Sequence, residues 1–250
     1  MPPKAIRLGI LVPSSNTALE PLTTALLASI NAVSSCTITA HFSRFPVTTI
    51  SLSPSGLAQF DLAPILAAAT LLAHANVDII GWSGTSAGWL GFDKDVELCA
   101  EIEKASGIRA TTSVLALNKA LKLWNVAKLG LVTPYMDDVQ AKIVDNYKEI
   151  GVNITAEKHL RVEKNTDIAD IGEEVLDGMV EEVIGASEVQ AVTTFCTNLV
   201  AAQRVRYWEE RHGIPIFDTV TTVVWDMVRA CKVDVSEVRG WGMLFLKGFT

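Results

Sequence analysis

One pattern occurs twice in each half of this chain: an apolar run that opens directly onto small polar residues. Residues 8–13 (Leu-Gly-Ile-Leu-Val-Pro) lead into Ser-Ser-Asn-Thr, and residues 129–134 (Leu-Gly-Leu-Val-Thr-Pro) lead into Tyr-Met-Asp-Asp. Farther along each half, residues 77–83 lead into Gly-Thr-Ser and residues 189–195 lead into Cys-Thr-Asn. Binding sites in parallel α/β sheets form at the carboxyl ends of the strands. The repeat therefore predicts two α/β lobes whose strand-end loops converge on one cleft.

Strand and helix patterns alternate along the chain, and each strand-to-helix crossover requires parallel pairing. Strands are expected near 8–12, 36–44, 77–82, 128–132, 154–160, 189–195 and 213–217, and helices near 20–30, 57–75, 93–106, 111–123, 137–150, 168–184, 199–212 and 219–232. We therefore expect an α/β fold of two pseudo-symmetric flavodoxin-like lobes with parallel sheets and a cleft between them. The first lobe is expected to contain residues 1–115 and 220–250, because the C-terminal helix is predicted to return to it. The second lobe is expected to contain residues 116–219.

Charge and hydropathy narrow the class of partner. The 250 residues carry a formal net charge of −7 and no cluster of Lys and Arg, which argues against nucleic acid or an anionic membrane as a partner. The first residues lack the long apolar core of a signal peptide. The longest apolar stretch, around 62–75, is interrupted by Pro64, Thr70 and His74 and is too short to span a bilayer. We expect a cytoplasmic protein without a membrane partner. The chain could form a homo-oligomer, and the sequence does not decide this.

The cysteines are widely separated, at positions 36, 99, 196 and 231. They form no CxxC or Cys/His cluster, so no metal site is expected. Cys99 and Cys231 fall in amphipathic helical patterns and are expected to be buried apolar residues. Cys196 follows a strand, and the polar Thr197 and Asn198 after it are expected to begin a helix. A helix N-terminus lowers the pKa of a thiol, which favours a reactive thiol at Cys196. An ordinary buried cysteine is the alternative.

The other strand-end loops also allow two interpretations. The loop of Gly84, Thr85 and Ser86 offers backbone N–H groups and two hydroxyls, which suit a carboxylate or an enolate-like oxyanion, but an ordinary helix N-cap has the same composition. The loop that holds Ser15 allows the same two interpretations. Tyr135 either donates its hydroxyl into the cleft or packs beneath a loop. A phosphate loop is disfavoured, because neither GxGxxG nor GxxxxGK[ST] occurs.

These segments resemble the aspartate/glutamate racemase superfamily, in the branch that holds maleate cis-trans isomerases and arylmalonate decarboxylases. The resemblance covers nearly the whole chain. The opening segment 12–17 is similar to that of the isomerases, which implies that Asn16 binds a substrate carboxylate, and Asn165 also looks isomerase-like. The loop 84–86 instead resembles the decarboxylase segment whose Thr and Ser help to form a dioxyanion hole. Tyr135 matches a tyrosine used by both, and Cys196 matches the second cysteine of the superfamily.

The chain departs from the superfamily pattern at the first cysteine. Racemases and maleate isomerases of this type use one cysteine from each lobe, whereas Gly84 stands at the first-lobe position here. Two-base racemisation needs an acid/base group on each face of the reacting carbon. In maleate isomerisation, the missing thiol resembles the nucleophile that attacks the double bond. A single thiol is enough for a decarboxylase.

We therefore expect a cofactor-independent enzyme that acts on a small dicarboxylate, with decarboxylation of a malonate-type acid as the main hypothesis. The catalytic residues are expected to be Thr85, Ser86 and Tyr135, which would hold one carboxylate, and Cys196, which would protonate the enediolate. The substrate-binding residues are expected to be Ser15, Asn16, Gly84, Asn165, Thr197 and Asn198. A maleate-type cis-trans isomerase or racemase-like isomerase is the alternative, and a non-catalytic carboxylate-binding protein is a further one. The variant Gly84→Cys is expected to supply a proton donor on the opposite face.

Overall fold

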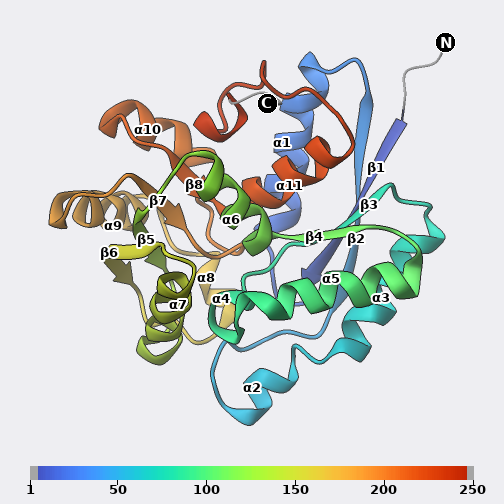
Figure 1. Cartoon of the computed structure of the whole chain (residues 1–250), viewed down its shortest axis with the longest axis horizontal. Helices are drawn as coiled ribbons and strands as arrows, with labels where there is room; N and C mark the ends of the chain where they lie inside the picture. The colour runs from blue at the N-terminus through green and yellow to red at the C-terminus, as the bar shows by residue number, and fades with distance from the viewer. Residues whose placement is uncertain (1–4, 247–250) are drawn as a thin grey trace.

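The computed structural model of the chain describes residues 5–246 and contains two four-stranded sheets with the same strand order (Figure 1). The first sheet has the order β2-β1-β3-β4, and its strands are β1 (Ala5–Pro13), β2 (Thr37–Phe45), β3 (Ile79–Trp82) and β4 (Ala110–Thr112). The second sheet has the order β6-β5-β7-β8, and its strands are β5 (Lys128–Thr133), β6 (Asn153–His159), β7 (Ala191–Thr194) and β8 (Ile216–Asp218). All strand pairs within both sheets are parallel. The predicted α/β fold with two pseudo-symmetric lobes is confirmed.

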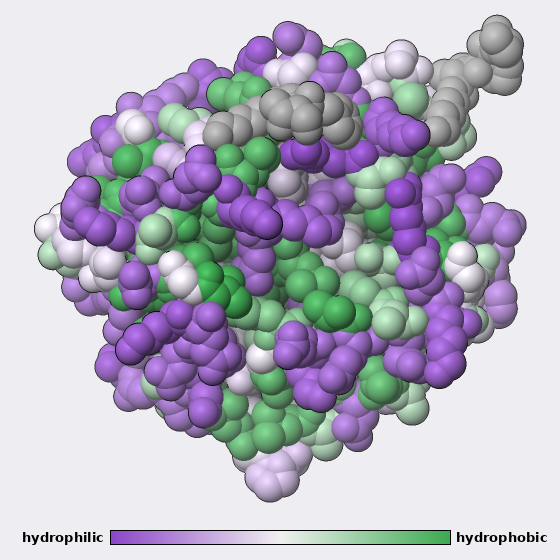
Figure 2. All heavy atoms as spheres, in the orientation of Figure 1, coloured by the Kyte–Doolittle hydropathy of each residue, from purple (hydrophilic) through white to green (hydrophobic). Residues whose placement is uncertain are grey.

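Helices connect the strands and cover both sheets (Figure 1). In the first half of the described chain they are α1 (Leu19–Val33), α2 (Pro54–Ala58), α3 (Leu62–His74), α4 (Ala87–Leu90), α5 (Phe92–Ser106) and α6 (Ser113–Leu123). In the second half they are α7 (Asp137–Glu149), α8 (Asn165–Ile168), α9 (Glu173–Ala186), α10 (Val205–His212) and α11 (Thr219–Ala230), with short 3₁₀ helices η1 (Ala202–Arg204) and η2 (Met243–Phe245). The face shown in Figure 2 is largely hydrophilic, and hydrophobic residues appear there in smaller groups.

The glycine repeated in the two opening strands has a packing role. A Cβ added to Gly9 in β1 would lie 2.8 Å from Val77 and 3.2 Å from Leu72 of α3. A Cβ added to Gly130 in β5 would lie 2.5 Å from Val183 of α9. Glycine at these two positions therefore lets one helix in each lobe pack directly against the opening strand.

The helix α11 follows the second sheet in sequence but packs against the first lobe. It contacts α1, α6 and β3, and a Cβ on Gly81 of β3 would lie only 2.5 Å from the sulfur of Met227 in α11. Beyond α11, the indole N–H of Trp241 donates a hydrogen bond to Ser29 of α1 over 2.9 Å. The C-terminal helix thus lies against the first lobe, while the division into residues 1–115 with 220–250 and residues 116–219 stays a prediction.

The predicted helix at 57–75 is two helices. The short α2 begins after Ser53, whose hydroxyl accepts a hydrogen bond from the N–H of Gly56 over 3.1 Å. A turn at residues 59–61 separates it from α3, which has Pro64 in its first turn, where the missing N–H is tolerated. Together the two helices make one stretch that is, by length and composition, apolar enough to cross a membrane. In the fold, α3 packs against β1 and β2.

Three further predicted helices have different bounds. The segment 111–123 begins as β4, because the buried Thr111 and Thr112 extend the first sheet before Thr112 caps α6 by accepting a hydrogen bond from the N–H of Leu115. The segment 168–184 is interrupted at residues 169–172, between α8 and α9. Residues 197–201 form turns, so the segment 199–212 becomes helical only at η1 and α10. No helix begins directly after Cys196, and that prediction is wrong.

Candidate active site

A small cavity lies where the carboxyl ends of β1, β3, β5 and β7 meet. Its free space is about 20 Å³, close to the least that one water molecule needs. Eight of the ten residues predicted for the site line this cavity: Asn16, Gly84, Thr85, Ser86, Tyr135, Asn165, Cys196 and Thr197. The strand-end loops of both lobes therefore converge on one place, as the sequence repeat indicates.

Two larger hollows on the described surface lack comparable chemistry. One of about 350 Å³ lies beside Arg206 and Arg239, and another of about 460 Å³ lies beside Leu22 and Gln203. Neither is lined by a cysteine or a tyrosine. Within residues 5–246, no three His, Cys, Asp or Glu side chains gather closely enough to hold a metal ion. The small cavity is therefore the candidate active site.

Thr85 and Tyr135 meet across the two lobes at this cavity. Their hydroxyl oxygens lie 2.6 Å apart, within hydrogen-bond distance. Burial, together with the nearby sulfur of Cys196, holds the pKa of Tyr135 well above its usual value, so its phenol is neutral and retains its proton at neutral pH. One of the two hydroxyl protons is used in this hydrogen bond, so the pair of neutral hydroxyls has one proton left to donate to an anion.

Cys196 is buried beside these hydroxyls, with only 3% of its surface exposed. Burial raises the pKa of its thiol to about 11, although hydrogen bonds from Tyr135 and from the backbone of Asn198 and Leu199 act in the opposite direction. The expected lowering of this pKa by a helix N-terminus does not occur, because no helix begins there. The thiol therefore stays protonated at neutral pH, which suits a proton donor better than a nucleophile, since the thiolate is the nucleophilic form.

Gly84 lies at the first-lobe side of the cavity, and no second cysteine lines it. A Cβ added to Gly84 would lie 2.1 Å from Cζ2 of the Trp82 indole, far closer than two carbon atoms approach without bonding. Gly84→Cys alone could therefore supply a second proton donor only if the indole moved out of the space that the new side chain needs.

Asn16 lines the cavity, and the protein itself uses both ends of its amide. Its oxygen accepts hydrogen bonds from the N–H groups of Ala18 and Leu19, at the start of α1, over 3.1 and 2.9 Å. Its nitrogen donates to the hydroxyl of Thr197 over 3.1 Å. Thr197 in turn donates to the carbonyl of Ser83 over 3.3 Å. Asn16 therefore anchors a helix and joins the lobes, and only its remaining N–H is available for a ligand.

Ser15 and Asn198 do not line the cavity, although both were predicted to bind substrate. Asn165 donates a hydrogen bond to the hydroxyl of Ser15 over 2.8 Å. The amide oxygen of Asn198 accepts from the N–H groups of Thr17 and Ala18, and its nitrogen donates to the carbonyl of Asn165 over 2.6 Å. In this structure the two residues hold the lobes together behind the cavity.

The apolar side of the cavity was missed by the sequence analysis. Residues 46–61 between β2 and α3, which we name the strap, contribute Val47, Ile50 and Phe60. Trp89 of α4 adds a ring whose centroid lies 5.8 Å from that of Phe60 and 5.3 Å from that of Tyr135. The strap is tied to the second lobe by an isolated antiparallel bridge at Thr49. Among these apolar side chains, Trp82 could have been predicted from the sequence, because it ends an apolar strand directly before the predicted loop 84–86.

Comparison with known proteins identifies relatives of both expected activities. The sequence model of the arylmalonate decarboxylase family matches residues 9–245. The maleate isomerase of Nocardia farcinica is 28% identical over 246 residues, 95% of this chain and 94% of that protein. The arylmalonate decarboxylase of Bordetella bronchiseptica is 24% identical over 169 residues, 67% of this chain and 70% of that protein. Most of the matching curated relatives are named maleate isomerase.

A solved structure supports the same fold. It is a Nocardia farcinica maleate cis-trans isomerase, in a cysteine-to-serine mutant form with a covalently bound succinylcysteine intermediate. Its TM-score is 0.86 at 24% sequence identity, covering 96% of this chain and 98% of that chain.

Proposed function

This chain belongs to the arylmalonate decarboxylase family, and from that membership and the side chains of the cavity we propose that it is a cofactor-independent enzyme that decarboxylates a malonate-type acid. The family holds both decarboxylases and maleate isomerases. The observation that carries the proposal is the single protonated thiol of Cys196, faced by glycine instead of a second cysteine.

The hydroxyls of Thr85, Ser86 and Tyr135 hold one carboxylate of the substrate in this proposal. The second carboxylate lies toward the apolar side chains of the strap, where a charge is poorly solvated. The bond between the α-carbon and this second carboxylate breaks, CO2 leaves, and the electron pair of the bond forms an enediolate with the retained carboxylate. The hydroxyls that bound the carboxylate then stabilise the enediolate.

Cys196 completes the reaction as the proton donor. Its S–H gives a proton to the α-carbon of the enediolate, and the resulting thiolate takes a proton from water before the next turnover. The raised pKa of the buried thiol supports this role, because the proton is present before the reaction begins. No redox step and no covalent intermediate is needed.

A maleate cis-trans isomerase is the second candidate, and the names of the relatives favour it. The Nocardia isomerase formed its succinylcysteine after another cysteine had been replaced by serine, so that protein has at least two cysteines. The cavity of this chain has one cysteine among its lining residues. If Cys196 attacked maleate, its thiol proton would have to be removed first, and no second thiol would be at hand to protonate the adduct.

Turnover of two substrate classes distinguishes the candidates. The purified protein is incubated in D2O with substituted malonates and, separately, with maleate, and the products are followed by NMR. The proposal predicts CO2 release and deuterium on the α-carbon of the monoacid, with loss of both in Cys196→Ser. Fumarate from maleate without decarboxylation of any malonate establishes the isomerase instead. Thermal stabilisation by these acids without turnover indicates a carboxylate-binding protein.

A further inference from the structure

Trp82 occupies the space in front of Gly84. A Cβ added to Gly84 would lie 2.1, 2.3 and 2.6 Å from Cζ2, Cε2 and Cη2 of the indole. Non-bonded carbon atoms have their optimal separation at about 3.5–4.0 Å. With the indole in this position, glycine is the residue that fits at position 84.

The indole is held in place by its surroundings. Trp82 is 1% exposed, and its ring centroid lies 4.8 Å from that of Phe45 at the end of β2. Its Nε1–H donates a hydrogen bond to the hydroxyl of Ser86 over 3.4 Å. Its backbone lies in β3, between Leu11 of β1 and Thr112 of β4. A side chain at position 84 therefore has to displace a ring that is packed and hydrogen-bonded.

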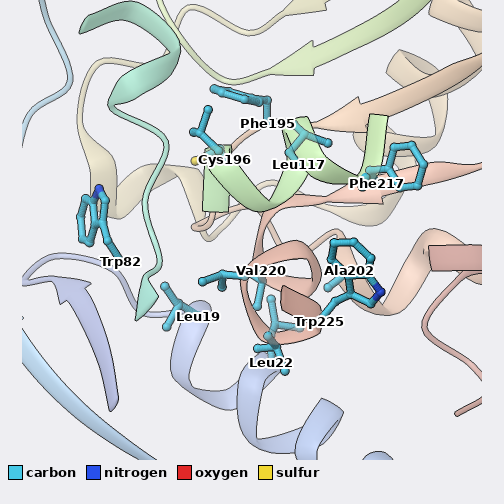
Figure 3. Packing of buried hydrophobic residues seen from close by; sticks show 14 of the residues in the cluster. Leu19, Leu22, Trp82, Leu117, Phe195, Cys196, Ala202, Phe217, Val220 and Trp225 are labelled. Carbon is cyan, nitrogen blue, oxygen red and sulfur yellow. The ribbon is translucent and has the colours of Figure 1, made fainter. Parts of the chain in front are cut away.

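Trp82 and Cys196 belong to opposite lobes and line the same cavity. Figure 3 shows the sulfur of Cys196 turned toward the side on which the Trp82 indole lies. A reacting carbon bound between them meets a thiol on one face and an aromatic ring on the other. Because the indole N–H is occupied by Ser86, that ring offers no proton to the carbon.

From this geometry we infer that Trp82 determines specificity in this site, by closing its first-lobe face and limiting the substrate to malonates that carry a small substituent. The limit on size follows from the position of the ring, which fills the space in front of Gly84 on that face, where a larger substituent on the reacting carbon would have to lie. The inference rests on the proposed function. The inference also explains why the reacting carbon is protonated by Cys196 from one face alone: Trp82 closes the other face.

A thermal-unfolding cycle tests the steric part of this inference without any substrate. Gly84→Ala is expected to lower the Tm by roughly 5 °C in the wild-type chain and by much less in a Trp82→Leu background. Gly178→Ala is the matched control, because nothing lies within 4 Å of a Cβ at that position, and it should shift the Tm equally in both backgrounds. Equal losses from Gly84→Ala in the two backgrounds would overturn the claim that the indole excludes a side chain there.

Turnover tests the specificity part. Trp82→Leu should raise the ratio of kcat/KM for phenylmalonate to that for methylmalonate by roughly 10-fold or more, the effect of a few missing methylene-sized contacts. An unchanged ratio overturns the size limit. If the wild-type chain decarboxylates neither acid, the proposed function fails, while the unfolding cycle still decides whether Trp82 blocks position 84.

The configuration of the product tests whether Trp82 closes the first-lobe face of the site. With a disubstituted malonate, the wild-type chain should form one enantiomer. The triple variant Trp82→Leu/Gly84→Cys/Cys196→Ser should form the opposite one, and Gly84→Cys/Cys196→Ser with the indole intact should form neither. Efficient formation of the opposite enantiomer by that double variant would show that Trp82 does not close this face.

Discussion

The hydroxyl of Thr85 and the phenol of Tyr135 lie 2.6 Å apart, although one follows β3 of the first sheet and the other follows β5 of the second. This pair of hydroxyls therefore forms only when both lobes are correctly placed. Because burial keeps Tyr135 in its neutral form, the pair carries no negative charge that would repel a carboxylate, and one of its hydroxyl protons is not used within the pair.

Tyr135→Phe should lower kcat by about 100-fold or more, the usual cost of losing one donor to an oxyanion. Decarboxylation rates of the purified variant measure the effect. Tyr147→Phe is a matched control, because Tyr147 is also fully buried and its hydroxyl has no hydrogen-bond partner among the described residues. Comparable kcat values for the two variants would remove Tyr135 from the oxyanion site.

Cys196→Ser should keep the fold and lose most activity, because a hydroxyl is a far weaker acid than a thiol. Activity of the unmodified enzyme should persist as the pH rises above 8.5, the usual pKa of a cysteine, and decline only as the pH approaches about 11, where Cys196 loses its proton. A pH–rate profile with Cys99→Ser as the control measures this. A decline centred near pH 8.5 would contradict the role of the buried thiol as the acid.

Asn16→Ala should lower the Tm by about 3 °C, because a lost helix-start acceptor costs about 1 kcal/mol, and it should also remove the link to Thr197. Asn16→Asp keeps an acceptor for the N–H groups of Ala18 and Leu19. That variant should retain most of the Tm but raise KM strongly, since it adds a negative charge to the proposed dicarboxylate site. If KM stays unchanged in Asn16→Asp, Asn16 does not face the substrate.

Asp95 should make stability depend on pH. Burial raises its pKa from 3.8 to about 7, although a hydrogen bond from Thr112 acts in the opposite direction. The folded form then holds a proton that the unfolded chain releases above about pH 4, so the contribution of Asp95 to stability is greatest at low pH and falls as the pH rises toward 7. The difference corresponds to at most about 4 kcal/mol. Burial also raises the pKa values of Glu209 and Asp218 to about 7, so Asp95→Asn should reduce the slope of Tm between pH 5 and 8 without abolishing it. An unchanged slope would exclude Asp95 as one of its sources.

The strand-end positions of the site were predictable from sequence because they follow from parallel topology. Once the strands of each half were recognised, Thr85, Tyr135 and Cys196 had to lie at the carboxyl edges of the two sheets. Their convergence on one cavity needed only the expectation that the lobes face each other.

The surroundings of these residues were not predictable in the same way. The pKa of Cys196 depends on how deeply the closed lobes bury it, and the turn that replaces the expected helix at residues 197–201 removes the effect of a helix N-terminus. The clash between Trp82 and a side chain at Gly84 depends on the orientation of one ring, which no local pattern specifies. The contribution of Val47 comes from a loop without strand or helix periodicity.

The strap has a kinetic consequence. A space of about 20 Å³ is smaller than any dicarboxylate, so the closed arrangement is one through which neither substrate nor product passes. The strap is joined to the second lobe by few backbone hydrogen bonds, among them Ile50 to Glu163 over 3.3 Å and Asn165 to Thr48 over 3.2 Å. If the chain turns over a dicarboxylate as proposed, these bonds have to break to admit substrate, and we expect the rate at which they break to set an upper limit on kcat. Exchange rates of these amide protons and kcat should therefore change together when the strap is loosened.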